Sequence, residues 1–165
     1  MKPWIRAAAP DDVDALAALN AEVQELHFGS RPDQFKPTHV SDIAQWLVRL
    51  LHNPAAKLWA AQIDAVVVGY VVAIVREKPE DAFCPARTWW DIDQIGVQAA
   101  YRRRGIGRAL VRQVVSEARA LGIREVELNS WTFNQDAHRA FASLGFTPKT
   151  VRFELRASEL DEGTK

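Results

Sequence analysis

The stretch Gln94-Ile-Gly-Val-Gln-Ala-Ala-Tyr-Arg-Arg-Arg-Gly-Ile-Gly-Arg-Ala-Leu-Val-Arg112 decides the fold of this chain. It begins as an apolar strand, turns at a basic, glycine-containing segment, and continues as a helix. Gly105 and Gly107 remove side chains where the helix begins, and the first amides of a helix are unpaired and carry partial positive charge. Four arginines surround the same turn: Arg102, Arg103, Arg104 and Arg108. The segment therefore predicts a binding site for a diphosphate.

Composition narrows the classes of protein to which the chain can belong. It has 165 residues, with 21 Lys+Arg balanced by 21 Asp+Glu. A net charge of zero argues against a general nucleic-acid binder, which carries a basic excess. Cys84 is the one cysteine, so no internal disulfide or cysteine zinc cluster can form. We expect no metal site.

The N-terminus, Met-Lys-Pro-Trp-Ile-Arg, has no apolar signal region. No apolar run approaches the roughly 20 residues that span a bilayer. A single cysteine also fits a reducing compartment. Together these features predict a cytoplasmic protein with no membrane partner.

Hydrophobic periodicity predicts alternating helices and strands. Strands are predicted over 4–7, 58–63, 66–75, 89–97, 123–131 and 151–155, and helices over 11–27, 40–51, 105–121 and 134–144. A polar loop is expected over 76–87 and a polar tail over 158–165. This order predicts an α/β fold with a mixed sheet, in a single domain spanning 1–165.

Simple alternation along 89–97 assigns its side chains to two faces. One face is expected to hold Asp91, Asp93, Ile95 and Val97, and the other Trp90, Ile92, Gln94 and Gly96.

Two common phosphate motifs fit the glycine turn poorly. A Walker A loop requires a Gly-Lys-Ser/Thr ending, which is missing. A dinucleotide fingerprint needs a third small residue where Leu110 stands, and it follows the first strand of a domain, whereas this turn comes late in the chain.

A third motif fits throughout. Arg102-x-x-Gly105-x-Gly107 matches the Arg/Gln-x-x-Gly-x-Gly/Ala signature, and a second block follows at Asn134-Gln-Asp-Ala-His-Arg-Ala-Phe-Ala-Ser-Leu-Gly-Phe146. Together the two blocks resemble the GNAT superfamily of N-acetyltransferases over nearly the whole chain. The resemblance implies a mixed, mostly antiparallel central sheet, with splayed strands 4 and 5, flanked by four helices.

The resemblance also implies acetyl-CoA, or another acyl-CoA, as co-substrate. Backbone groups of Ile95, Gly96 and Val97 would bind the pantetheine arm, and Asn134 would contact the cofactor from the second block. The residues implied for the pyrophosphate are Arg102, Arg103, Arg104, Gly105, Ile106, Gly107 and Arg108.

Acetyl transfer to an amine needs a base, because a lysine-like ammonium has a pKa near 10.4 and costs roughly 4–5 kcal/mol to neutralise at neutral pH. Asp93 matches the strand position that is often acidic in similar enzymes, and Asp91 is the alternative. The backbone amide of Val97 is the expected oxyanion donor.

Phe141 departs from the family pattern, in which many relatives have a tyrosine that protonates the CoA thiolate. Water or His138 would have to replace it. The same departure keeps a second hypothesis open, a non-catalytic module that binds or senses acyl-CoA. A nucleic-acid-binding module that uses the arginine run is a third.

Substrate recognition in this family falls to the region between the first two helices and the loop before strand 4. The residues there are His27, Phe28, Arg31, Asp33, Phe35, Glu77, Asp81 and Trp89, and each also fits a packing or solvated role. Their mixed charges and aromatics predict a small polar or amphipathic amine, or a peptide terminus, as acceptor. The pattern does not name this amine, and it leaves a homodimer open.

Overall fold

The computed structural model describes residues 2–157. One compact unit ends at Phe133 and a second begins at Asn134. The first contains β1 (Trp4–Ala7), α1 (Val13–Ser30), α2 (Val40–Leu51), β2 (Ala56–Ile63), β3 (Val66–Lys78), β4 (Arg87–Val97), α3 (Ile106–Ala120) and β5 (Val126–Leu128), with the short 3-10 helices η1 (Pro10–Asp12) and η2 (Ala99–Tyr101). The second contains α4 (Gln135–Leu144).

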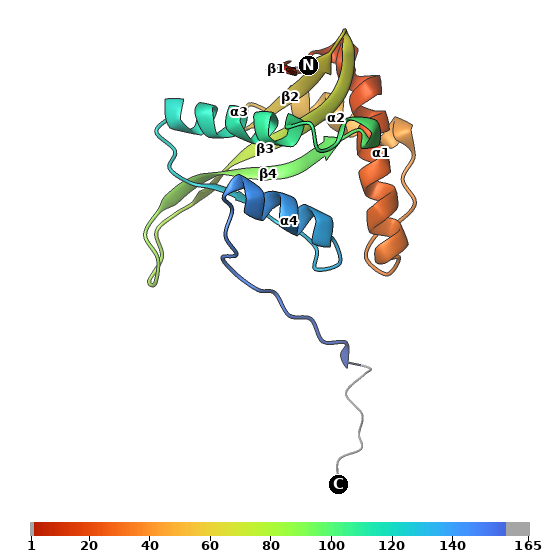
Figure 1. Ribbon diagram of the computed structural model, residues 1–165. Helices are drawn as coiled ribbons and strands as arrows, with labels where there is room; N and C mark the ends of the chain where they lie inside the picture. The colour runs from red at the N-terminus through yellow and green to blue at the C-terminus, as the bar shows by residue number, and fades with distance from the viewer. Residues whose placement is uncertain (1, 158–165) are drawn as a thin grey trace. The chain divides into compact units, whose positions relative to one another are not determined.

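The five strands form one sheet in the order β1-β2-β3-β4-β5 (Figure 1). The first four pair antiparallel, and β5 pairs with β4 in parallel. The predicted fold class is therefore confirmed: the sheet is mixed and mostly antiparallel, and α1 to α4 are the four helices.

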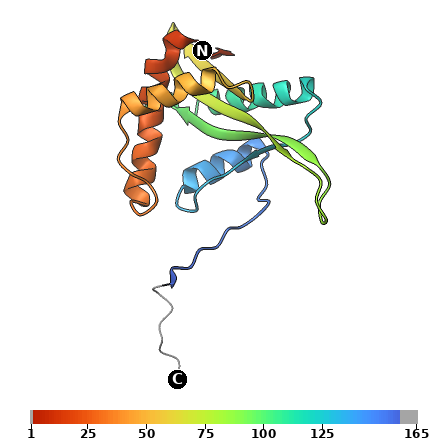
Figure 2. The same ribbon diagram turned by 180° about the vertical axis from the view of Figure 1, so that it is seen from behind.

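Helices cover both faces of this sheet. Leu16 of α1 and Leu47 of α2 pack with Leu58, Tyr70 and Val72 in one core cluster. The amphipathic α3 buries Ile106, Leu110, Val111, Val114 and Ala118. Figures 1 and 2 view the sheet from opposite sides, with α3 in front in one and α2 in front in the other. The sheet thus has an α1/α2 face and an α3 face.

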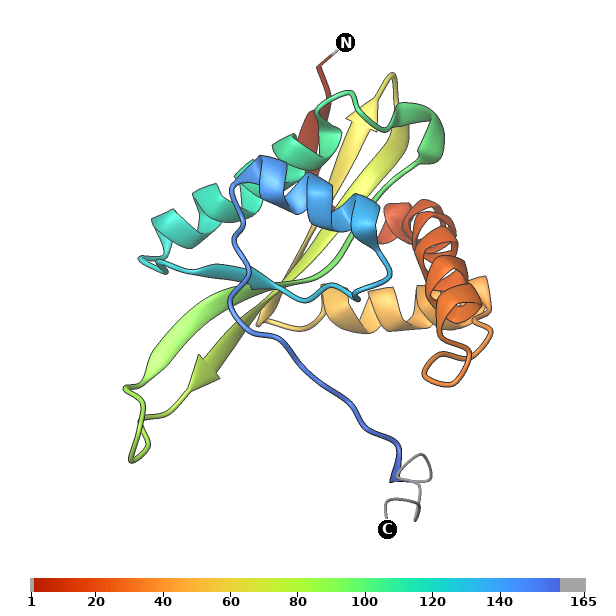
Figure 3. The same cartoon turned by 60° about the horizontal axis from the view of Figure 1, so that its bottom comes forward.

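Several element boundaries differ from the sequence prediction. The expected loop over 76–87 is shorter, because β3 continues to Lys78 and β4 begins at Arg87. These ends form a hairpin that extends past β2 (Figure 3). The expected strand over 123–131 shrinks to Val126–Leu128, where it pairs with β4.

The predicted strand over 151–155 is wrong, since these residues form no strand. Alternation favours a strand only where a neighbouring strand supplies hydrogen bonds, and the apolar side chains of Val151 and Phe153 stay 70% and 90% exposed. The predicted tail over 158–165 lies outside the described residues. Among residues 2–157, no helix is long and apolar enough to cross a bilayer.

Candidate functional site

Strand β4 contains a β-bulge at Asp93. Opposite it on β3, Ala73 faces Ile92 and Val72 faces Gln94, so Asp93 is an extra residue between two paired ones. A bulge bends its strand and shifts the alternation of side chains by one position.

The bulge corrects the predicted division of β4 into two faces. Asp91 lies opposite Ile74 and Gln94 lies opposite Val72. Both partners belong to the α1/α2 face, and directly opposite residues of an antiparallel pair share a face. Asp91 and Gln94 therefore share a face, whereas alternation had separated them.

Beyond the bulge, β4 has an open side. Strand β5 pairs only with Trp90, Asp91 and Ile92, and β4 runs on past the end of β5 (Figures 1 and 3). This divergence is the splay that the sequence predicted for strands 4 and 5.

The backbone of β4 directs two peptide N–H groups to this open side. The Gln98 amide donates to the Val68 carbonyl at 2.9 Å. Hydrogen-bonded and non-hydrogen-bonded pairs alternate along an antiparallel ladder. The Gly96 N–H, two residues before that of Gln98, therefore points to β3, whereas the N–H groups of Ile95 and Val97 point away from it. On the near side of the bulge, the Trp90 amide points to the β5 side and donates to the Glu125 carbonyl at 3.0 Å. Ile95 and Val97 thus present their amides where β5 has left the sheet.

The close packing of Tyr70 requires a residue without a side chain at Gly96. A Cβ placed on it would lie 2.7 Å from Cε1 of Tyr70. The glycine lets the buried Tyr70 ring pack directly under the β4 backbone, which fixes the strand at the point where it opens.

Tyr70 belongs to a polar network at the α1/α2 face. Asn20 Nδ2 donates to Tyr70 Oη at 2.7 Å and to Gln94 Oε1 at 3.3 Å, and Gln24 Nε2 donates to Asn20 Oδ1 at 3.3 Å. Burial raises the pKa of Tyr70 above its ordinary range, an effect that Asn20 opposes and Asp93 strengthens. The Tyr70 hydroxyl therefore stays neutral, and the network ties α1 to β4 beside the bulge.

Two carboxylates share one guanidinium on the same face. Arg76 Nε lies 3.4 Å from Asp91 Oδ2, and Arg76 Nη2 lies 3.8 Å from Asp93 Oδ1. Burial, and next the charge of Asp91, raise the pKa of Asp93, while Arg76 and a hydrogen bond from Gln94 oppose the rise. Its side chain remains 30% exposed. Asp93 is thus an accessible carboxylate that is more basic than an ordinary aspartate.

The turn after β4 leads into an uncapped helix. Gly105 is the N-cap residue of α3 with φ of 79°, and Arg103 has φ of 62°. No side chain caps α3, and its first turn contains no acidic residue. A Cβ on Gly107 would meet nothing within 4 Å. The first amides of α3, Ile106 to Arg108, are therefore approachable by an anion.

The arginines of the turn have different partners. Arg102 Nε donates to the Val97 carbonyl at 3.0 Å, which joins the turn to the end of β4. The Arg104 guanidinium lies 5.2 Å from the Tyr101 ring centroid. Arg102 thus engages the Val97 carbonyl, while the N–H of Val97 belongs to the preceding peptide group and points to the open side by the ladder alternation.

Residues of the second sequence block lie in the second unit. Asn134 is the N-cap residue of α4, and its side chain accepts a hydrogen bond from the Ala137 amide at 3.2 Å. The Phe141 ring packs edge-on against Phe146, with 6.0 Å between centroids. His138 is half-buried on the same helix.

Two of the predicted substrate residues, His27 and Phe35, meet in an aromatic cluster with Trp131 and Phe133. Trp131 and Phe133 were not among the predicted substrate residues, although two aromatics at the end of the predicted strand over 123–131 and just after it were a signal for them. Others lie in the β3–β4 hairpin: the Arg87 guanidinium stacks on Trp89 at 4.2 Å, and Lys78 pairs with Asp81 at 2.7 Å. Residues 2–157 contain no group of three metal-ligating side chains.

Comparison with known proteins matches the Acetyltransferase (GNAT) family over residues 20–146. This chain belongs to that family. It is 31% identical over 101 residues to N-acetyltransferase 8F1 of Rattus norvegicus, covering 61% of this chain and 44% of the relative. It is 28% identical over 116 residues to aminoglycoside N(6')-acetyltransferase type 1 of Klebsiella aerogenes, covering 70% of this chain and 75% of the relative.

The chain thus spans less than half the length of the rat relative. N-acetylaspartate synthetase of Xenopus tropicalis is likewise matched over only part of its length. The identity is 31%, over 66% of this chain and 36% of that protein.

Solved structures of other proteins share the fold. A mutant form of the BH1408 protein from Bacillus halodurans superposes with a TM-score of 0.87, at 24% identity over 93% of this chain and 98% of that one. Aminoglycoside N-acetyltransferase AAC(6')-Iy, in a complex with CoA, superposes with a TM-score of 0.75, at 18% identity over 94% and 95%.

Proposed function

We propose that this chain is an N-acetyltransferase that moves the acetyl group of acetyl-CoA to a primary amine of a small molecule or peptide. The observation that carries the proposal is the open side of β4, with the amides of Ile95 and Val97 directed toward it, next to an uncapped α3 terminus. Membership of the GNAT family supports it. We also propose that the protein acts in the cytoplasm, since a single cysteine fits a reducing compartment. We further propose that it binds no nucleic acid, since its net charge is zero.

The residues fit the co-substrate in two places. Ile95 and Val97 present backbone amides for the pantetheine arm, and Gly96 allows the tight packing that holds the strand in place. The α3 amides from Ile106 to Arg108 fit the pyrophosphate, because Gly107 leaves open space above them. Bound there, acetyl-CoA would supply an activated acetyl thioester.

The proposed chemistry assigns two roles beside β4. Asp93 accepts a proton from the acceptor ammonium, and its raised pKa makes it a better base than an ordinary aspartate. The amine nitrogen then bonds to the acetyl carbon while the carbon–sulfur bond breaks, and the second proton that the nitrogen loses passes to water. The Val97 N–H stabilises the charge that develops on the carbonyl oxygen. Because Phe141 has no hydroxyl, the thiolate takes its proton from water.

An assay of free thiol release across a panel of amines tests this proposal, with acetylated product confirmed by mass spectrometry. We expect amine-dependent thiol release that follows saturation kinetics. A protein that binds no CoA and acetylates no amine would refute the proposal.

The second candidate function is a non-catalytic acyl-CoA sensor, and Phe141 is the residue that favours it. A sensor would bind CoA but release no thiol with any amine. Phe141→Tyr separates the two functions, because restoring the hydroxyl speeds thiolate protonation in an enzyme and leaves a sensor inactive.

A further inference from the structure

Four half-buried aromatic rings gather at the end of α1. His27 stacks on Phe35 with 4.9 Å between ring centroids, and meets Phe133 edge-on at 5.9 Å. Trp131 lies 5.3 Å from Phe35 and 6.1 Å from Phe133. This aromatic cluster joins α1, the α1–α2 loop and the segment after β5, three parts that are distant in sequence. Because no ring is fully buried, the cluster keeps ring surface for a ligand.

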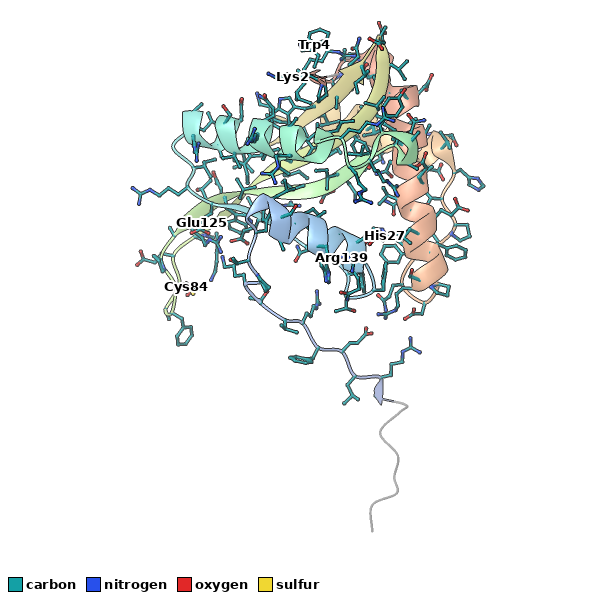
Figure 4. All side chains as sticks on the ribbon, viewed as in Figure 1. Lys2, Trp4, His27, Cys84, Glu125 and Arg139 are labelled. Atoms are coloured by element: carbon teal, nitrogen blue, oxygen red, sulfur yellow. The ribbon has the colours of Figure 1, made fainter. Side chains whose placement is uncertain are left out.

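Two independent features place the aromatic cluster beside Asp93. Along α1, Asn20, Gln24 and His27 follow one another at spacings of four and three, which puts them on one helix face. The first two contact Gln94, and His27 lies only about 4.5 Å further along the helix axis than Gln24. Figure 4 shows His27 on α1, on the side toward the segment that follows β5.

The second feature is the end of β5. Leu128 is paired with Ile92, so the chain leaves β4 at the level of Asp93. Trp131 follows three residues later and Phe133 five. The splay between β4 and β5 is therefore bordered by the carboxylates on one side and by the aromatic cluster on the other.

The charges at this border are few and largely compensated. Arg31 pairs with Asp33 at 2.9 Å, and its guanidinium lies 5.3 Å from the Trp131 centroid. Burial lowers the pKa of His27, so its ring is neutral at neutral pH. Asp91, Asp93 and Arg76 together leave one negative charge. One uncompensated carboxylate matches one ammonium group, and it suits a polycation or an acidic amine poorly.

We propose that the acceptor is a monoamine with a flat aromatic body, whose ammonium lies at Asp93 and whose ring stacks on the aromatic cluster. The proposal rests on the N-acetyltransferase function and names its substrate class. Aromatic rings prefer aromatic neighbours in offset or edge-on arrangements, beyond the gain from burying apolar area. An aliphatic amine of equal size would lose that preference.

A matched panel of amines tests the proposal. 2-Phenylethylamine and 2-cyclohexylethylamine share a carbon skeleton and an amine but differ in aromaticity, while putrescine adds a second ammonium group and aspartate adds two carboxylates. We expect kcat/KM for phenylethylamine to exceed that for cyclohexylethylamine by roughly two- to tenfold, and to exceed that for putrescine and for aspartate by more. Equilibrium binding of the same amines to the CoA-bound protein gives a readout that does not depend on turnover.

Two variants link the preference to the aromatic cluster. Phe35→Leu keeps an apolar side chain and should abolish the preference for phenylethylamine by raising its KM, with CoA affinity retained. Phe83→Leu is the control, since Phe83 is 95% exposed in the β3–β4 hairpin, and should change nothing. Equal rates with the phenyl and cyclohexyl amines, or an unchanged preference in Phe35→Leu, would overturn this inference and leave the N-acetyltransferase function standing. Absence of CoA binding and of all amine acetylation would instead overturn both.

Discussion

At the scale of single residues, Asp93 combines an unusual position with an unusual carboxyl group. It is the extra residue of the β4 bulge, and burial together with Asp91 raises its pKa. Asp93→Asn should lower kcat/KM about a hundredfold or more at neutral pH, the range expected for a lost general base. The loss should shrink as rising pH deprotonates the amine without help.

A pH–rate profile of the Asp93→Asn variant and the parent protein measures this effect. In the parent, the acid limb should lie above the pH at which an ordinary aspartate titrates, because the pKa of Asp93 is raised. Asp91→Asn serves as the matched control and should reduce the rate less. Parallel profiles for the parent and Asp93→Asn would remove Asp93 from the mechanism.

His27 makes the aromatic cluster sensitive to pH. Its pKa is lowered from 6.5 by burial, so the unfolded chain binds a proton more readily than the folded one. The contribution of His27 to the free energy of unfolding is therefore fully present above about pH 6.5. It is lost as the pH falls from there through the lower pKa of His27 in the folded state. His27→Phe should remove this part of the pH dependence.

Melting temperatures at pH 8 and pH 5.5 check the prediction. The difference between the two should be larger for the parent than for His27→Phe. His39→Phe, a substitution on the exposed residue before α2, is the control and should behave like the parent. If both variants keep the full pH dependence, His27 does not cause it.

Sequence predicted some residues of the site well and their arrangement less well. Glycine spacing located the turn at Gly105 and Gly107, because a helix start has a local chemical signature. The bulge at Asp93 depends on the register between β3 and β4, which no short motif encodes. Alternation therefore assigned Gln94 to the wrong face. The aromatic cluster was half found for a similar reason, since Trp131 meets Phe35 only through the tertiary fold.

At the scale of elements, the N-terminus of α3 is the clearest predicted binding feature. Gly107→Val should lower CoA affinity at least tenfold, because the added side chain fills the open space where the pyrophosphate would approach the first amides. The fold should survive, since a Cβ at Gly107 meets no atom within 4 Å outside its chain neighbours and the backbone of its own helix.

Titration calorimetry with CoA measures the affinity, and circular dichroism checks the fold. Gly29→Val is a matched control, because Gly29 is also helical and also has nothing within 4 Å of a Cβ. It should bind CoA like the parent. An unchanged affinity in Gly107→Val would contradict the diphosphate assignment.

Helices were predicted more accurately than strands. The physical reason is that helix hydrogen bonds join residues close in sequence, whereas strand hydrogen bonds join residues that are distant in sequence. The 40–51 helix matched α2 because its apolar positions and their spacing are local. Strand ends depend on partners elsewhere in the chain. The 123–131 segment pairs with β4 over three residues only, and 151–155 forms no ladder despite its alternating apolar residues.

At the scale of the whole molecule, CoA binding should be visible as stability. A ligand that binds only the folded state at about 100 times its Kd adds roughly 2.7 kcal/mol to the free energy of unfolding. For a chain of this length, each kcal/mol raises Tm by about 2–4 °C, so saturating CoA should raise Tm by roughly 5–11 °C. Part of this added free energy of unfolding should come from electrostatic attraction between the arginines around the turn and the diphosphate of CoA.

Thermal unfolding with and without CoA, at low and high salt, measures both parts. The shift in Tm should shrink as salt rises, because screening weakens the attraction between the diphosphate and exposed guanidinium groups. Gly107→Val should show about half the parent's shift or less, since a tenfold weaker Kd leaves roughly 1.4 of the 2.7 kcal/mol, whereas Gly29→Val should match the parent. Dephospho-CoA lacks the 3'-phosphate but keeps the diphosphate, and should retain most of the shift. A shift that depends on the 3'-phosphate and survives in Gly107→Val would move the binding site away from the start of α3.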